Sequence, residues 1–348
     1  MRYLLLALLG SLCCCIACAD AVSSFSRTVT INGHKFAVQG VRVDLHDPSV
    51  KMRVGLALGM VGRTEQLAGI AGRYHAVAAI NGSFFDAYCR DALKNPDMTR
   101  ITHGQLAYKS DLGCLLGFDA DNTPHLGSIR YKLTGTTHGK DDYRNGWYAY
   151  WLNRKPTSAA CITIFTPHWG PRVEAMGGTL VVVQDGVVTA ITAEAAPIPV
   201  RGFIIHFRGE ASMRARFSVG TPVTFSPKVQ MGDADTWTHV QEALGCGPRV
   251  LANGTPVFAP REEGFNDPKV LQLSGMRSGV GYTPDRLLYL ITVKGARVSD
   301  LGPILKALGC TEGMNLDGGA SSGLWLQGKY LTKPGRAVSN ALLVVRGE

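Results

Sequence analysis

Turns that contain glycine interrupt this chain at short intervals, and they constrain its fold more than any other feature. The sequence has 41 glycines in 348 residues, and Asn32-Gly33 and Asp185-Gly186 lie within segments that alternate apolar and polar residues. Such a pair is typical of a β-hairpin, because both residues tolerate the positive φ of a tight turn. The pattern predicts hairpins over residues 25–45 and 181–188, with further strands over 201–207 and 286–293.

Two short segments have helical spacing instead. In residues 64–74 and 299–308, apolar side chains recur at i, i+3, i+4 and i+7. Ser299 is the predicted N-cap of the second helix, and Gly309 is predicted to lie just beyond its end. The predicted fold class is α+β: a mixed, β-rich single domain with a few helices packed on sheets.

Residues 123–166 are rich in aromatic side chains and lack a clear period. They include Trp147, Tyr148, Tyr150 and Trp151. Two interpretations remain open, strand packing and the wall of a pocket, and packing is the more usual role of such residues.

The N-terminus has the pattern of an export signal. A basic residue precedes a short apolar run, which is followed by small residues and Cys18. We therefore expect residues 1–19 to be a signal, a domain over 22–348, and an exported protein that is periplasmic, bound to the cell envelope or secreted. Cleavage by ordinary signal peptidase and a lipoprotein site at Cys18 both remain open, and the second would attach the protein to a membrane.

Five cysteines follow the signal: Cys89, Cys114, Cys161, Cys246 and Cys310. This odd number leaves at least one unpaired in a monomer, and up to two disulfides are compatible with an exported protein. A bridge between Cys89 and Cys114 is one local candidate.

The composition and residue spacing limit the kinds of partner and cofactor that we expect. The net charge is +9, but the basic residues are scattered, so we expect no nucleic-acid partner, whereas an anionic polymer or a phosphate ester fits. The spacing of cysteines and histidines suggests no zinc site. We predict no cofactor and no metal, with calcium at the acidic pairs 141–142 or 233–235 left open. The oligomeric state stays undetermined.

The densest chemistry lies in residues 314–324, Met-Asn-Leu-Asp-Gly-Gly-Ala-Ser-Ser-Gly-Leu. Asn315 and Asp317 alternate about a leucine, so we expect them on one face of a strand. Gly318 and Gly319 permit a sharp turn whose exposed N–H groups can receive an anion. A purely structural turn with an Asx-type hydrogen bond is the alternative.

A similar unit occurs earlier in the chain. The first predicted helix leads into an apolar run that ends in Asn81-Gly82-Ser83, just as the second leads into the turn at Asp317. If the two units share an architecture, the two turns lie side by side at one rim.

Several residues fit the cleavage of a glycosyl phosphodiester. The Arg277 guanidinium lies in a glycine-bracketed segment and matches the two free oxygens of a phosphodiester. Asp317 could act as an acid or base, or stabilise oxocarbenium-like charge. Candidates for a second carboxylate are Asp86, Asp91, Glu262 and Glu263. Serine hydrolase chemistry at Ser321 or Ser322 is disfavoured, because no Gly-x-Ser-x-Gly elbow is present.

Five blocks in this order resemble the phosphodiester glycosidase family. They are Ala79-Ile80-Asn81-Gly82-Ser83-Phe84-Phe85-Asp86, Gly245-Cys246-Gly247-Pro248-Arg249-Val250-Leu251, Met276-Arg277-Ser278-Gly279-Val280-Gly281, Asn315-Leu316-Asp317-Gly318-Gly319-Ala320-Ser321-Ser322 and Arg336-Ala337-Val338-Ser339-Asn340-Ala341-Leu342. The chain departs from the family pattern at Ser83 and in the residues around Arg277.

The resemblance implies a hydrolase that cleaves the sugar–phosphate bond of a glycosyl phosphodiester, such as a GlcNAc-1-phosphodiester. It implies catalytic roles for Asp317, Arg277 and Asn81. Substrate-binding roles are implied for Gly82, Phe85, Asp86, Asn315, Gly318, Gly319 and Ser321. The alternative is a protein on the same scaffold that binds an anionic glycan, or assembles an envelope polysaccharide, without catalysis.

Overall fold

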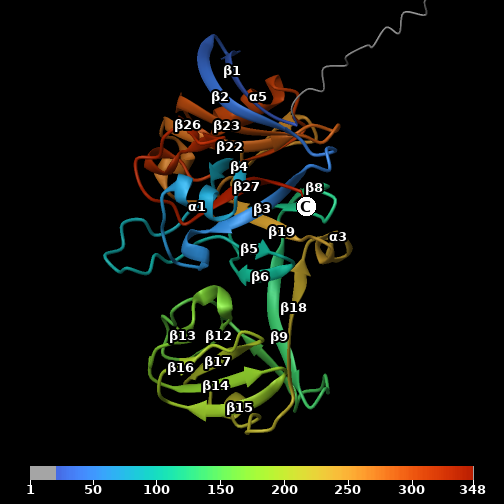
Figure 1. Cartoon of the computed structure of the whole chain (residues 1–348), viewed down its shortest axis with the longest axis vertical. Helices are drawn as coiled ribbons and strands as arrows, with labels where there is room; N and C mark the ends of the chain where they lie inside the picture. Colours follow the sequence, from blue (N-terminus) through green and yellow to red (C-terminus); the bar gives the residue numbers. More distant parts are fainter. Residues whose placement is uncertain (1–20, 348) are drawn as a thin grey trace, which may run out of the picture.

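The computed structural model describes residues 21–347 as a β-rich single domain with a few short helices, as the sequence predicts. The predicted export signal and the lipidation site at Cys18 lie outside these residues. Figure 1 shows an elongated molecule, in which a main body carries a smaller distal lobe made of residues 130–231.

Three sheets build the main body. The largest has the order β1 (Val22–Ile31), β2 (His34–Asp44), β23 (Leu287–Ala296), β22 (Gly275–Tyr282), β24 (Glu312–Asn315), β20 (Arg249–Ala252) and β21 (Thr255–Pro256). The second has the order β26 (Lys329–Thr332), β25 (Leu324–Leu326), β4 (Ala76–Asn81), β27 (Asn340–Arg346) and β3 (Val50–Leu56). The third has the order β6 (Gln105–Tyr108), β5 (Arg100–Thr102), β19 (Glu242–Cys246), β7 (Cys114–Phe118) and β8 (Pro124–Gly127).

One apolar core joins these three sheets. Ile80, Leu290 and Leu244, each from a different sheet, are completely buried in the same cluster. Burial of each such side chain stabilises the fold by about 1.5–3 kcal/mol. The core therefore fixes the strand ends of the three sheets relative to one another.

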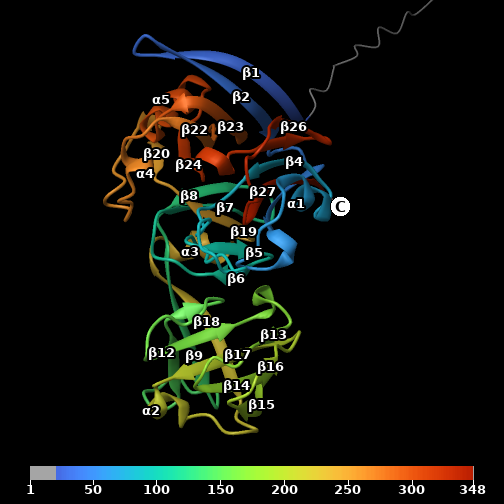
Figure 2. The same cartoon turned by 90° about the vertical axis from the view of Figure 1, so that its left-hand side faces the viewer.

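The distal lobe is built from two larger sheets and a two-stranded ribbon. The strands of its first sheet are β10 (Gly146–Ala149), β9 (Arg130–Thr137) and β18 (Val223–Met231). The second is ordered β11 (Trp151–Leu152), β12 (Cys161–Phe165), β17 (Gly202–Arg208), β14 (Thr179–Gln184) and β15 (Val187–Thr192), and the ribbon pairs β13 (Arg172–Val173) with β16 (Ala196–Pro197). The long strands β9 and β18 connect this lobe to the main body (Figures 1 and 2).

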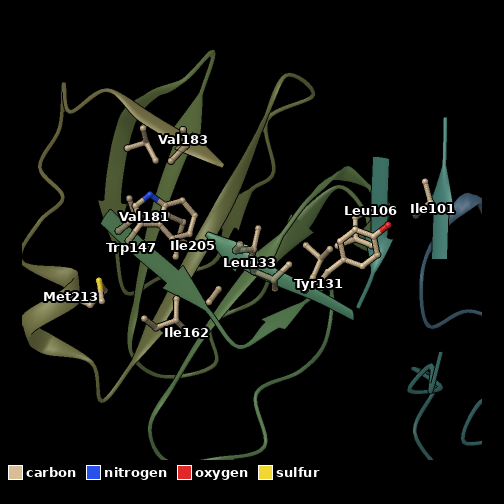
Figure 3. Close-up of a cluster of buried hydrophobic side chains, with 14 of the residues drawn as sticks. Ile101, Leu106, Tyr131, Leu133, Trp147, Ile162, Val181, Val183, Ile205 and Met213 are labelled. Atoms are coloured by element: carbon tan, nitrogen blue, oxygen red, sulfur yellow. The ribbon is translucent and has the colours of Figure 1, made fainter. Parts of the chain in front are cut away.

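The core of the distal lobe continues into the main body. Figure 3 shows Trp147, Ile162 and Ile205 inside the lobe, and Tyr131 on β9 directed toward Leu106 of the third main-body sheet. Because all of these side chains belong to one buried cluster, the lobe is packed against the body as well as connected to it.

Helices contribute little to the described part of the chain. The helical segments are α1 (Leu67–Arg73), α2 (Ala211–Arg214), α3 (Ala234–Thr238), α4 (Pro268–Leu271), α5 (Val298–Ala307) and the 3₁₀ turns η1 (Ala57–Gly59), η2 (Pro167–Trp169) and η3 (Gly319–Ser321). None of the helices in residues 21–347 combines the length and apolar character needed to cross a bilayer.

Both predicted helices are present as α1 and α5. The predicted N-cap of α5 was wrong: the cap is Arg297, because the Asp300 carboxylate accepts a hydrogen bond from the Arg297 N–H at 2.7 Å. Gly309 lies beyond the end of α5 with φ 92°, as predicted.

The predicted hairpin turns are also present. Asn32-Gly33 joins β1 to β2, and Asp185-Gly186 joins β14 to β15, with positive φ at all four residues. Residues 123–166 contain more regular strands than the sequence indicated, and Trp147 is buried in the core, which confirms the packing interpretation for that residue.

The candidate disulfide is absent from the structure, and Asp142 and Asp233, two of the acids considered for calcium, accept local backbone hydrogen bonds. The five cysteines of the described chain are free, so the candidate bridge between Cys89 and Cys114 is absent. Asp233 instead caps α3, and Asp142 caps a turn at Asn145. Residues 21–347 hold no group of three or more His, Cys, Asp or Glu side chains that could bind a metal ion.

Candidate functional site

Two strands from different sheets end at the same place. The Asp317 N–H, just after β24, donates to the Gly82 carbonyl at 3.0 Å. The Asn81 side-chain amide, at the end of β4, donates to the Asp317 carbonyl at 2.6 Å. These hydrogen bonds confirm that the two predicted turns lie side by side, although β4 and β24 belong to separate sheets.

The Asn81 side chain is the joint between these turns. Its Oδ1 accepts hydrogen bonds from the Ser278 hydroxyl at 2.7 Å and from the Gly323 N–H at 2.9 Å. Asn81 is completely buried, so a lost partner could not be replaced by bulk water. The side chain therefore holds β4, β22 and the turn after β24 in a fixed arrangement.

A cavity of about 690 Å³ opens beside this joint. Its walls come from the segment after β4, from the segment between α4 and β22, and from the turn at Asp317. Arg154 reaches it from the distal lobe, and Arg336 reaches it from the segment before β27. Charged side chains of both signs line an otherwise largely apolar space, which is the usual composition of a binding site for a small polar molecule.

Asp317 is the most perturbed acid on this cavity. Burial raises the pKa of its carboxyl to about 6, and the nearby Asp97 charge adds to the rise. A hydrogen bond from Ser321, the charge of Arg336 and the Gly318 N–H act in the opposite direction. Desolvation outweighs these contacts, so Asp317 titrates near neutral pH, where a proton-transfer group is most effective.

Asp97 is a second carboxylate on the same cavity, and the sequence analysis missed it. Burial raises its pKa, while the charges of Arg100 and Arg154 lower it. Asp97 lies in an irregular segment between β4 and β5, where no periodicity marks a functional face. Of the four carboxylates considered from the sequence, only Asp86 lines the cavity.

Arg277 lines the cavity, but backbone carbonyls already engage its guanidinium. Its Nε donates to Ala296 O at 3.2 Å, and its Nη2 donates to Lys269 O at 2.7 Å and to Leu273 O. Burial lowers its pKa, and the charges of Asp317 and Asp300 oppose that shift. Two of its three nitrogens are therefore committed to the protein, which disfavours the predicted role as a two-pronged phosphate clamp.

Seven of the ten residues expected from the sequence line the cavity: Phe85, Asp86, Arg277, Asp317, Gly318, Gly319 and Ser321. Asn81, Gly82 and Asn315 lie beneath it instead. The Asn315 amide donates to Gly247 O at 2.8 Å, and the Gly82 N–H donates to Asn340 O at 3.0 Å. The Gly82 N–H is therefore already paired and is not free to bind a substrate, the role that the resemblance implied for Gly82.

The three glycines of the two turns are needed for different reasons. A Cβ on Gly82 would lie 1.9 Å from the Asn340 side-chain oxygen, and one on Gly318 would lie 2.9 Å from Arg277 Nη1. Gly319 has open space around it but a φ of 61°, which side chains disfavour.

Three cations on the cavity were not assigned a role from the sequence: Arg154, Lys269 and Arg336. Arg336 is the first residue of one of the five sequence blocks, so that block could have identified it as a site residue. Arg154 and Lys269 lie outside all five blocks. No histidine is among the described residues that line the cavity, so Ser321 has no Ser-His pair there.

Fold and cavity together define a class: a β-rich protein with a desolvated carboxylate and several cations around one open cavity, an arrangement suited to an anionic small molecule or chain end. The family model for phosphodiester glycosidases matches residues 177–345. This match supports, over that segment, the resemblance seen in the motifs. The Asn81-Gly82 turn lies outside the matched segment.

Solved structures share the fold. A hypothetical protein from Synechocystis superposes with a TM-score of 0.81 at 25% identity, covering 93% of this chain and 62% of its own. A protein from Burkholderia pseudomallei K96243 superposes with a TM-score of 0.72 at 20% identity, and the match covers 89% of this chain and 74% of the other protein.

The zebrafish N-acetylglucosamine-1-phosphodiester α-N-acetylglucosaminidase catalytic domain, auto-inhibited by its pro-peptide, gives a TM-score of 0.50 at 13% identity, covering 94% of this chain and 85% of its own. No curated protein matches the chain.

Proposed function

We propose that this protein is a hydrolase that cleaves the sugar–phosphate glycosidic bond of a glycosyl phosphodiester, such as a GlcNAc-1-phosphodiester. The observation that carries the proposal is the Asp317 carboxyl, whose pKa is raised to about 6 at a cavity that also presents Arg154, Lys269 and Arg336. The phosphodiester glycosidase match over residues 177–345 supports the same reaction class.

In this reaction, water adds to the anomeric carbon and the bond from that carbon to the phosphate oxygen breaks. The products are the free sugar and a phosphomonoester. Because a phosphate is already a stable anion, it leaves with little help from an acid, and stabilisation of the oxocarbenium-like sugar matters more. Asp317 in its ionised form provides that negative charge or accepts the proton of the attacking water.

Asp97 is the second carboxylate in this proposal. Burial raises the pKa of Asp97 and the charge of Asp86 raises it further, while the charges of Arg100 and Arg154 lower it. The charge of Asp97 contributes to the raised pKa of Asp317, so the two carboxyls titrate as an interacting pair. Asp97 then accepts a hydrogen bond from the sugar or the attacking water, while Asp317, ionised above a pH of about 6, acts at the anomeric carbon.

The test is a panel of α- and β-linked glycosyl phosphodiesters, including GlcNAc-1-phosphodiesters, incubated with the purified protein and with Asp317→Asn. We expect release of sugar and phosphomonoester from at least one member by the wild type, and a loss of at least 100-fold in kcat/KM in the variant. Asp285→Asn, in an exposed turn, is the matched control.

Two outcomes would contradict the proposal. One is the absence of sugar release from every member of the panel. The other is release that Asp317→Asn leaves unchanged. Tight binding of an anionic glycan without turnover would instead favour the non-catalytic alternative.

We further propose that the protein acts outside the cytoplasm, because residues 1–19 have the pattern of an export signal. Cell fractionation would locate the protein. Mass spectrometry of its mature N-terminus would distinguish a lipidated Cys18 from ordinary cleavage.

A further inference from the structure

The exposed ring of Tyr88 holds two cations at the edge of the cavity. The Lys269 Nζ lies 5.1 Å from the centre of the ring, and the Arg336 guanidinium carbon lies 4.9 Å from it. Arg336 Nη2 also donates a hydrogen bond to the Tyr88 hydroxyl at 3.0 Å. Three distant segments of the chain thus bring two positive charges to one aromatic side chain.

Neither cation has a carboxylate partner in the described part of the chain. The ion pairs found there include neither Lys269 nor Arg336. The closest acid in sequence, Asp267, uses its carboxylate to cap α4, accepting a hydrogen bond from the Lys269 N–H at 2.8 Å. Two like charges held near one ring repel each other, and an anion between them would remove that repulsion.

The two cations also lie near the proposed chemistry. The charge of Arg336 acts on the Asp317 carboxyl and lowers its pKa against the effect of burial. Both cations line the same cavity as Asp317. A phosphate bound at this edge therefore leaves room for the attached sugar to lie against Asp317.

Arg277 holds the segment that carries one of these cations. Its hydrogen bonds to Lys269 O and Leu273 O clamp the backbone at α4 and just beyond it. Two nitrogens of the guanidinium predicted to bind phosphate are thus bonded to protein carbonyls, while the Lys269 ammonium has no partner among the ion pairs of the described chain.

We propose that Lys269, Arg336 and the Tyr88 hydroxyl form the subsite that binds the phosphate of the substrate, and that Arg277 is a positioning residue that places Lys269. The proposal rests on the proposed function in one respect: the bound phosphate is taken to be part of a glycosyl phosphodiester substrate. The anion subsite itself requires no turnover. Lys269 and Arg336 neutralise the phosphodiester charge, and Tyr88 keeps the two cations at a fixed separation.

The experiment measures binding without catalysis. Dimethyl phosphate, a monoanionic phosphodiester without a sugar, is titrated into the wild type, the Lys269→Gln/Arg336→Gln double variant and Lys306→Gln, and binding is followed by phosphorus NMR line broadening. Lys306 is exposed on α5, away from the cavity, and controls for loss of charge. Circular dichroism and thermal unfolding establish that each variant is folded.

We expect the double variant to bind dimethyl phosphate at least tenfold more weakly than the wild type and Lys306→Gln. Equal binding by all three proteins would overturn the proposal, and so would an absence of measurable binding by the wild type. If dimethyl phosphate binding depends on Lys269 and Arg336 while no glycosyl phosphodiester is hydrolysed, the anion subsite stands and the proposed hydrolase function fails.

A double-mutant cycle tests the positioning role of Arg277. Arg277→Lys keeps the charge but cannot make the same forked set of hydrogen bonds. If Arg277 acts through Lys269, adding Lys269→Gln to Arg277→Lys weakens dimethyl phosphate binding by much less than Lys269→Gln weakens it in the wild type. Additive losses would mean that Arg277 does not act through Lys269, and would overturn this part of the proposal.

Discussion

Asp317 remains partly protonated at pH values where most aspartates are fully charged. Because burial raises its pKa to about 6 in the folded protein, from an ordinary value of 3.8, the folded state binds a proton more tightly than the unfolded state. The free energy of unfolding therefore falls as the pH rises from about 4 to about 6. Above that window, the full cost of a buried charge is present.

Replacing the Asp317 carboxylate is expected to raise the stability of the protein while it lowers the activity. We expect Asp317→Asn to increase the free energy of unfolding at pH 7.5 by on the order of 1 kcal/mol, and to leave it nearly unchanged at pH 4. Urea unfolding at the two pH values measures this difference. In the wild type, kcat/KM should decline as the pH falls below about 6. The prediction would be contradicted if the stability that Asp317→Asn gains over the wild type were smaller at pH 7.5 than at pH 4.

Replacing the glycines of the two turns by alanine gives a second prediction for single residues. Gly82→Ala places a methyl group 1.9 Å from the Asn340 side-chain oxygen, so the joint must shift, at a cost of about 1–3 kcal/mol. Gly319→Ala meets no atom within 4 Å and costs only about 1–2 kcal/mol, through its φ of 61°. Urea midpoints rank the two, and a larger loss for Gly319→Ala would contradict this account.

At the scale of elements, the site depends on two strand ends held by one amide. Asn81→Ala removes three hydrogen bonds and leaves the Ser278 hydroxyl and the Gly323 N–H without their partner. We expect a loss of about 2–4 kcal/mol in the free energy of unfolding. We also expect a fall in kcat larger than any change in KM, because Asp317 moves while the phosphate subsite stays in place. Asn266→Ala, at an exposed position, is the control.

The sequence predicted the elements better than it predicted the contacts. Hairpin turns follow from local φ preferences, and α1 and α5 follow from apolar spacing, so both can be inferred from short windows. The side-by-side placement of the turns followed from the repeated unit. Which nitrogens of Arg277 remain free depends on carbonyls 4 to 19 residues away, and no local pattern carries that information.

The cavity also draws on segments that no motif linked. Asp97 belongs to an irregular segment, and Lys269 belongs to the four-residue helix α4, too short for a periodic signal. Tyr88 meets Arg336 across 248 positions of the chain. These contacts exist because three sheets share one core, which is a property of the whole fold.

At the scale of the whole molecule, the distal lobe supplies one cation to a cavity in the main body. Arg154 follows β11, and its guanidinium carbon lies 4.3 Å from the centre of the Trp151 ring, which holds the side chain in place. Its charge lowers the pKa of Asp97. Packing of the lobe against the body, through the cluster that contains Tyr131 and Leu106, is therefore part of the geometry of the site.

Arg154→Ala tests this dependence. Without the guanidinium, the pKa of Asp97 rises further and a positive charge is lost from the cavity, so we expect kcat/KM for a hydrolysed glycosyl phosphodiester to fall about tenfold. Lys155→Ala removes the adjacent exposed charge, whose Nζ lies 4.0 Å from an Asp91 oxygen, and should change kcat/KM by less than twofold. Equal effects of the two variants would mean that the lobe contributes only general charge. Thermal unfolding of both variants should stay close to wild type, because neither side chain belongs to the buried cluster that joins lobe and body.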